Sequence, residues 1–452
     1  MAFYSYYRAI KARLGDLWWY SLLLMAAQRF SDIINIFIGL WLVPRFLNQS
    51  QLGAVLPLMQ IGTVLGLPFL IISTPLSKIL NVYATKNDQG KIKSILIDLA
   101  KYTVIFLAGI VVFSLVAMKP IFLRLHVPDS KFSWLIIIAG TIAAIGPLGT
   151  VIMQALKRFN TITLLTFLTA PVRLITLIVI LPVQALTGYF AGQTIPHVIG
   201  LGVSVFSARN FFSKKIKRVN YFSDDGKRIF SYIWTYGLTT CIGVVQIAVE
   251  SFVIRHRLPE LESAAYYIIS RFAETGGAMG MALILIAFPL MSEQHEKGER
   301  TQKIMWHSFL GSLSVGCLLT LFFLVAGKHI LSLSSLWHDY IPYTRHMAVL
   351  TLIHSLRIAA ACFIFSELAG NRARFLIYYA TFVILECAFL YSITGYEFFN
   401  AVLKPEHINA ITNFNPCRLT FILATMIIFS TGVFIATVMH ALSRYNIKKH
   451  RS

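Results

Sequence analysis

The sequence predicts an all-α polytopic membrane protein with about twelve transmembrane helices in two six-helix bundles and with both termini in the cytoplasm. Three observations support this prediction: few charged residues, many long apolar segments, and an uneven distribution of basic residues between alternate loops. Of the 452 residues, 57% are hydrophobic and 13% are charged, about half the charged share of a soluble domain. The mean hydropathy is +0.69. This composition excludes a soluble enzyme, a disordered chain and a disulfide scaffold.

Apolar segments follow one another along almost the whole chain. A spanning helix needs roughly 20 mostly apolar residues. Such runs are expected at 17–45, 53–79, 102–118, 134–156, 160–181, 184–206, 229–254, 263–291, 305–327, 343–368, 375–394 and 419–441. The first run continues past Ala27 without a cleavage signal, so we expect a retained helix rather than a signal peptide.

The longest cytoplasmic connection, 207–228, predicts an N-terminal bundle at 1–206 and a C-terminal bundle at 229–452. Pro75 and Pro289 each precede a polar, basic loop at corresponding places in the two halves. This similarity indicates a parallel repeat, a frequent transporter design with its site between the halves.

The basic residues give the orientation. The formal net charge is +21. With cytoplasmic termini, more than twice as many loop lysines and arginines fall on the cytoplasmic side as on the other, as the positive-inside rule requires. The positive charge is then explained by basic loops that lie against an anionic membrane leaflet. No nucleic-acid partner is expected.

No motif for an enzyme, a metal or a cofactor is present in the sequence. The five cysteines show no CxxC spacing. A P-loop, HExxH, GxSxG and metal cluster are all absent from the sequence, which excludes an ATP-driven pump on this chain alone. We therefore expect no metal, no cofactor and no enzymatic activity.

Ionisable residues inside a membrane segment indicate function because they are costly there. In the first segment, Gln28, Asp32 and Asn35 recur on one helical face, and Arg29 lies three residues before Asp32, close enough to pair. This stripe either lines a central cavity or contains a structural ion pair that fixes helix packing.

The eighth segment repeats this pattern. Arg271 and Glu274 have the same spacing, and Gly276 and Gly280 form a GxxxG motif typical of close helix packing. Arg271 lies near the outer end, so snorkelling to the interface is the alternative interpretation.

Other charged residues lie deep in later segments. Glu250, with Gln246 four residues earlier, is a candidate proton or Na⁺ site; the alternative is pairing with Arg255 or Arg257. Glu386 has no local cation, which implies protonation or a partner on another helix. The remaining candidates are Arg357, with His354 three residues before it, and Arg173, which follows Pro171 and could equally snorkel.

Two stretches resemble a known family. VPRFLNQSQLGAVLPLMQIG, from Val43, is similar to the junction of the first two helices in bacterial polysaccharide-export flippases of the O-antigen type, and SAAYYIISRFAETGGAMGMALILIAFPLMSEQHEKGER, from Ser263, is similar to their eighth helix. Together with twelve spans in two halves, they resemble the multidrug/oligosaccharidyl-lipid/polysaccharide (MOP) transporter superfamily. The resemblance implies two bundles around a cavity. It also implies a flippase that moves a polyprenyl-pyrophosphate-linked oligosaccharide from the inner to the outer leaflet for surface polysaccharide synthesis.

The resemblance also implies roles for the embedded residues. The cavity cations that would bind the pyrophosphate are Arg29, Arg271, Arg357 and Arg173; the candidates for ion coupling are Asp32, Glu250, Glu274 and Glu386; the polar cavity residues are Gln28, Asn35, Gln246 and His354. The implied partners are the lipid-linked glycan, membrane lipids, H⁺ or Na⁺, and a glycan polymerase or glycosyltransferases. The implied location is the inner (plasma) membrane of a bacterium.

Three other functions stay open. An H⁺- or Na⁺-coupled multidrug or organic-cation antiporter of the same fold would need an acidic cavity. A membrane enzyme of glycan assembly would need a large outer loop, and the longest one, 395–418, offers little chemistry beyond Glu397, Glu406 and His407. A non-transporting scaffold subunit is the third.

Overall fold

A computed structural model describes residues 23–86, 88–127, 133–155, 158–212, 216, 217, 219, 222–296, 301–369, 373–393 and 418–449. Regular secondary structure in these residues is entirely helical. Each of the twelve predicted segments overlaps one helix or consecutive helices of the described chain, and the segment ends 17–22, 156 and 394 lie outside the described residues. The predicted loop 395–418 lies outside the described residues except for its last residue, and the predicted linker 207–228 lies partly outside them.

The chain forms two compact units. Unit 1 holds the described residues of Met1–Phe46, Ile61–Ile121 and Asp129–Ile233. Its helices are Leu23–Phe46, which includes η1 (Ile38–Leu42) and α2 (Val43–Phe46), then the end of α3 (Gln49–Leu65), α4 (Leu67–Thr85), most of α5 (Gln89–Arg124), α6 (Ser133–Ile145), α7 (Pro147–Ala155), α8 (Phe159–Ile180), α9 (Ala185–Ala208) and η2 (Arg209–Phe212). Helix α9 packs against α6, α7 and α8, and α4 packs against α6 and α7.

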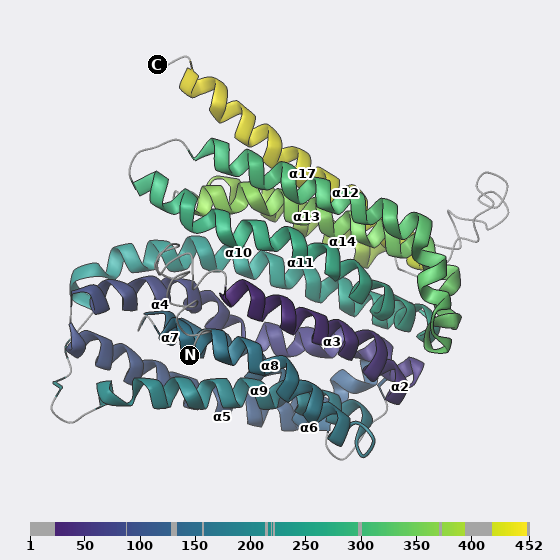
Figure 1. Ribbon diagram of the computed structural model, residues 1–452, viewed down its shortest axis with the longest axis horizontal. Coiled ribbons are helices and arrows are strands. Elements are labelled where there is room, and N and C mark those ends of the chain that lie inside the picture. Colours follow the sequence, from purple (N-terminus) through teal and green to yellow (C-terminus); the bar gives the residue numbers. More distant parts are fainter. Residues whose placement is uncertain are drawn as a thin grey trace, which may run out of the picture. The chain divides into compact units, whose positions relative to one another are not determined.

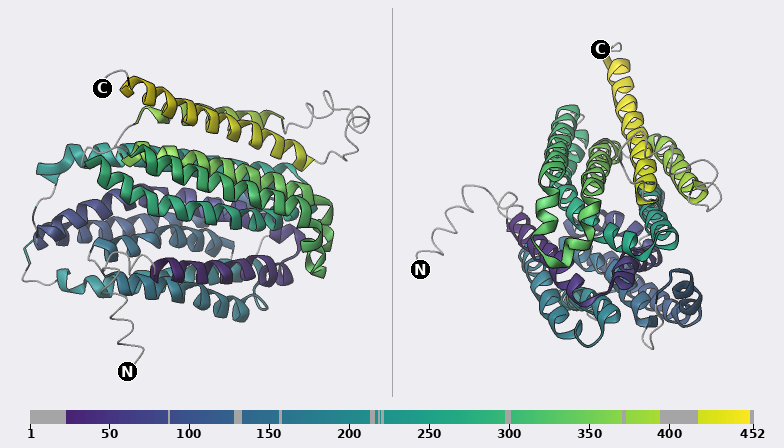
Figure 2. Two further views of the ribbon diagram at one scale, coloured as in Figure 1. Left: turned by 45° about the horizontal axis from the view of Figure 1, so that its top comes forward. Right: turned by 90° about the vertical axis from the view of Figure 1, so that its right-hand side faces the viewer.

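Unit 2 holds the described residues of Leu47–Gln60, Phe122–Pro128 and Trp234–Ser452. Its helices are the first part of α3, most of α10 (Phe222–Arg257), α11 (Glu260–Glu296), α12 (Gln302–Ser332), η3 (Ser335–Tyr343), α13 (Thr344–Ala369), α14 (Phe375–Ile393) and α17 (Arg418–Lys449). Helix α13 packs against α11, α12 and α17, and α14 packs against α17. These helices run side by side along their length (Figures 1 and 2).

The helices are long and apolar enough to cross a bilayer. Within the described residues, nine candidate spans meet this criterion, or ten if the bent pair Gln49–Leu65 and Leu67–Ser73 counts as one span. The protein is therefore a multi-pass, all-helical membrane protein, as predicted. The number twelve, the cytoplasmic termini and the division at 207–228 stay predictions.

Two helix breaks occur at glycines that precede prolines. Gly66 separates α3 from α4 with a bend of 62°, and Gly146 separates α6 from α7. Pro68 and Pro147 lie in the first turn of the helix that follows, where a missing N–H costs no hydrogen bond. Several other prolines lie inside continuous helices, among them Pro57, Pro75, Pro171 and Pro196.

The first helix contains a π-helical turn for a related reason. The N–H of Val43 donates to the carbonyl of Ile38, five residues earlier. The next residue, Pro44, has no N–H to donate, and its ring would clash with the carbonyl four residues before it. The wider turn accommodates the ring without ending the helix.

Arg255 holds three separate segments of unit 2 together. Its Nε donates to the carbonyl oxygen of Leu125 at 2.8 Å, and its Nη2 donates to the carbonyl oxygen of His126 at 2.7 Å and to Oγ of Ser50 at 3.0 Å. Its side chain is buried. These bonds explain why the start of α3 and the end of α5 belong to the same compact unit as α10. They also correct one alternative from the sequence: Arg255 binds oxygens of these segments rather than Glu250.

Close packing of α3 on α6 gives a first test. A Cβ atom on Gly62 would overlap the backbone of Gly140, whereas Gly109 in α5 has no atom within 4 Å of such a Cβ. Small residues permit this approach between membrane helices. We expect Gly62→Ala to reduce the stability of the detergent-purified protein by about 1–3 kcal/mol through overpacking, measured by chemical unfolding. Gly109→Ala should leave stability unchanged, and equal behaviour of the two variants would contradict the packing.

Candidate functional site

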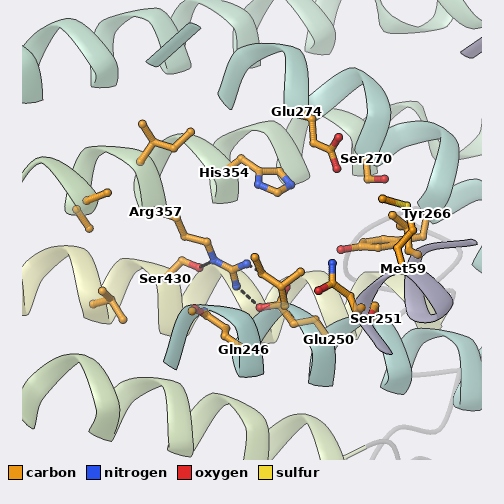
Figure 3. A pocket seen from close by; sticks show the side chains of 18 of the residues that line it. Met59, Gln246, Glu250, Ser251, Tyr266, Ser270, Glu274, His354, Arg357 and Ser430 are labelled. Atoms are coloured by element: carbon orange, nitrogen blue, oxygen red, sulfur yellow. Dashed lines mark hydrogen bonds and ion pairs between the residues drawn. The ribbon is translucent and has the colours of Figure 1, made fainter. Parts of the chain in front are cut away.

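A cavity of about 540 Å³ lies within unit 2, within the size range of small-molecule sites (Figure 3). Side chains from α3, α10, α11, α13, α14 and α17 line it. Polar and charged groups from several helices point into this space, among them Gln246, Glu250, Glu274, His354 and Arg357. The cavity therefore brings together residues that are far apart in the sequence.

Arg357 of α13 is the centre of the polar groups in this cavity. Its Nη1 and Nη2 donate to the two carboxylate oxygens of Glu250 in α10, at 3.0 and 2.5 Å. Nη2 also donates to Oε1 of Glu386 in α14 at 2.8 Å, and Nε donates to Oγ of Ser430 in α17 at 2.9 Å. Gln246 completes the network by donating to Oε2 of Glu386 at 2.6 Å. One guanidinium thus joins four helices, with a bidentate pair at its core.

The network is almost closed to solvent. Glu386 is fully buried, Glu250 is 3% exposed, and Gln246 and Ser430 are buried as well. With both carboxylates ionised, two negative charges face one positive charge. A single proton or monovalent cation would neutralise the one negative charge that is left over. A low-dielectric site favours that neutralisation strongly. Glu250 lines the cavity, whereas Glu386 is not among the lining residues, although both carboxylates bind the same Nη2 of Arg357.

Helix α11 forms another wall of the cavity. Tyr266, Ser270 and Glu274 follow one another at four-residue spacing, and all three line it. Arg271 also lines the cavity and pairs with Glu274 at 2.9 Å, as the sequence spacing predicted. This pair is more accessible than the Arg357 network, since the Glu274 side chain is 43% exposed.

His354 lies in the cavity between the Arg357 network and the Arg271–Glu274 pair. It is one turn before Arg357 on α13, and its ring lies on the side toward Glu274 and Ser270 (Figure 3). Its Nε2 is buried and makes no hydrogen bond within the described chain. This nitrogen can therefore accept or donate a hydrogen bond to a bound molecule, depending on the tautomer.

The remaining predicted residues lie in unit 1. Asp32 accepts from Nε2 of Gln28 at 3.1 Å and from Nη1 of Arg29 at 3.1 Å. Asn35 accepts from Nη1 of Arg173 at 2.8 Å, which ties the first helix to α8. The predicted Arg29–Asp32 pair is confirmed. Its side chains remain 38% and 25% exposed.

Several cavity residues were not predicted from the sequence. Tyr266, Ser270 and Tyr379 line the cavity, and Ser430 binds Arg357. The four-residue spacing of Tyr266, Ser270 and Glu274 is a signal that could have identified the α11 wall. Ser430 gives no such signal, because a single serine in an apolar helix usually bonds to its own backbone.

The sequence itself matches no protein-family model, and a search of curated proteins gives no match. Solved structures do match. A MOP superfamily transporter from Pyrococcus furiosus is 13% identical with a TM-score of 0.63, and the match covers 96% of this chain and 95% of that one. The chain has the MOP transporter fold.

Two MATE family transporters of the MOP superfamily agree with this assignment. An outward-facing structure has 13% identity and a TM-score of 0.64, and the match covers 98% of this chain and 99% of that one. An inward-facing structure has 11% identity and a TM-score of 0.63, and the match covers 94% of this chain and 98% of that one. The MOP fold predicted from the sequence is confirmed, whereas the O-antigen-type branch stays a prediction because such low identities show the fold alone.

The Arg357 network predicts a specific pattern of stability. Removal of one partner from a buried ion pair leaves an uncompensated charge and costs about 3–5 kcal/mol. We expect Arg357→Met to lower the stability of the purified protein by that amount, measured by chemical unfolding. The triple variant Arg357→Met/Glu250→Gln/Glu386→Gln should regain most of the loss, since no unpaired charge remains. A triple variant that is less stable than Arg357→Met would contradict this account of the network.

Proposed function

We propose that the protein is a secondary transporter that moves organic cations across the membrane in exchange for H⁺ or Na⁺. One observation carries the proposal. Among the described residues of the cavity and its attached network, Glu250, Glu274 and Glu386 face two guanidinium groups, those of Arg271 and Arg357. With all five groups ionised, the site has an excess negative charge.

The form of the cavity also suits an organic cation. Tyr266 and Tyr379 line it, and aromatic faces attract cations in desolvated sites. Its remaining lining includes apolar side chains such as Leu56, Ile247 and Val433. An apolar cavity with a few polar groups is typical of sites for small organic molecules.

Glu250 is the residue we propose for exchange. It is the carboxylate of the Arg357 network that lines the cavity. When Glu250 releases the guanidinium and takes a proton, an Na⁺ ion or a cationic substrate, Arg357 still has Glu386 as its partner. The buried arginine is then never left without a counter-charge, which would be the costly state.

Transport of a lipid-linked oligosaccharide is less well supported. That function needs cations that can receive a pyrophosphate, but Arg29, Arg271 and Arg357 each already bind a carboxylate. The similar P. furiosus protein is described as having a pocket of reverse polarity that suggests a different function. The MOP fold thus accommodates more than one cavity polarity. The substrate class must therefore be inferred from the charges of the individual site.

The test is transport in proteoliposomes that contain the full chain. We expect efflux of tetraphenylphosphonium or ethidium driven by an imposed pH or Na⁺ gradient. Glu250→Gln should reduce this transport at least tenfold, because the exchangeable charge is removed. Glu260→Gln, a matched change at an exposed position of α11 outside the cavity, should have no effect.

A different result would contradict the proposal. If wild type moves no organic cation but flips a fluorescent polyprenyl-pyrophosphate-linked oligosaccharide, the flippase proposal replaces this one. A bacterial inner-membrane location and partnership with a glycan polymerase or glycosyltransferases belong to that proposal.

A further inference from the structure

An apolar groove of about 350 Å³ lies in unit 1, among α5, α6, α7 and α9, away from the charged residues described above. Apolar side chains such as Ala100, Val104, Ile152 and Val205 line it. Among the described residues of its lining, only Thr103 has a polar side chain, and its Oγ1 donates to the carbonyl of Leu99 at 2.7 Å. The described side chains of the groove therefore leave no free hydrogen-bond donor, and a predominantly apolar occupant fits this lining.

The surface beside the groove faces lipid. In the span Gln89–Ala117, only 11% of the most apolar window is buried within the protein. Tyr102, Val104 and Ile105 are 63%, 67% and 57% exposed. Exposed apolar side chains at this density are typical of a lipid-facing surface, which would place acyl chains at the mouth of the groove.

One end of the groove carries positive charge. The first turns of α5 meet the segment that follows η2: Nζ of Lys93 donates to the carbonyl of Ile216 at 2.8 Å, and the N–H of Val219 donates to Oγ of Ser94 at 3.0 Å. Leu96 of α5 lines the groove next to this junction.

Exposed cations follow residues of the groove lining at this end. Arg209 follows Ala208 and lies over the Phe206 ring at 4.1 Å, whereas Lys101 follows Ala100, about midway along the α5 part of the lining. Lys217 is also exposed here. The acidic residues of the same region are Asp88, which pairs with Lys91, and Asp98, so the described residues leave a net positive charge.

We propose that this groove is a binding site for one anionic phospholipid. An acyl chain lies along α5 and α9, and the phosphate lies at the end marked by Arg209, on the same side of the groove as the Lys101 side chain. An acyl chain matches the apolar lining, and the basic end matches an anionic headgroup. This site does not depend on which substrate the cavity of unit 2 transports.

The experiment is native mass spectrometry of the full chain in detergent, titrated with dioleoylphosphatidylglycerol or dioleoylphosphatidylcholine. Wild type should bind the first phosphatidylglycerol molecule at least fivefold more tightly than phosphatidylcholine. Ala100→Phe fills the groove and should weaken the binding of both lipids by a similar factor. Val112→Phe, at an exposed position of α5 that does not line the groove, should bind as wild type does.

A second pair of variants tests the headgroup without changing the groove. Lys101→Gln/Arg209→Gln should abolish the preference for phosphatidylglycerol and leave binding of phosphatidylcholine unchanged. Lys119→Gln, an exposed lysine near the other end of α5, should keep the preference. Equal affinity of wild type for the two lipids, or unchanged binding by Ala100→Phe, would overturn the proposal.

Discussion

A guanidinium inside an apolar helix bundle must have counter-charges, and the arrangement of unit 2 follows from that requirement. Arg357 lies in the middle of α13, and its partners come from α10, α14 and α17. Each of these helices must hold one residue at bonding distance from the same group, which fixes their positions along the bundle. Arg255 acts similarly on α3 and the end of α5, but with neutral oxygens as partners. The cavity is the space left where α11 faces this fixed group of helices.

The sequence predicted those features that depend on residues close together along the chain. Helix positions follow from long apolar runs, and Arg29–Asp32 and Arg271–Glu274 follow from a three-residue spacing that places both side chains on one helical face. The partner of Glu250 was not predictable in this way, because Arg357 is 107 residues away. The local alternative, Arg255, is five residues from Glu250, a spacing that puts the two side chains on different faces of the helix.

The fold alone does not determine the polarity of the site. MOP transporters of the same fold include MATE family proteins and a protein with a pocket of reverse polarity, so a count of embedded arginines is a poor guide to the charge of the substrate. The sequence interpretation treated Arg271 and Arg357 as cations available to a pyrophosphate. Their carboxylate partners instead support the proposed transport of organic cations, because a paired guanidinium presents little positive charge to the cavity.

The presence of two carboxylates on one arginine has a consequence for any transport cycle. A site with one carboxylate would leave Arg357 unpaired whenever that carboxylate bound something else, and a buried unpaired charge costs several kcal/mol. Glu386, which is fully buried and bound to the same guanidinium, removes this penalty. In the proposed transport cycle, Glu250, at the cavity wall, exchanges partners at a cost that a bound ion or substrate offsets. Under this proposal, Glu386 keeps Arg357 paired and so makes Glu250 available for exchange.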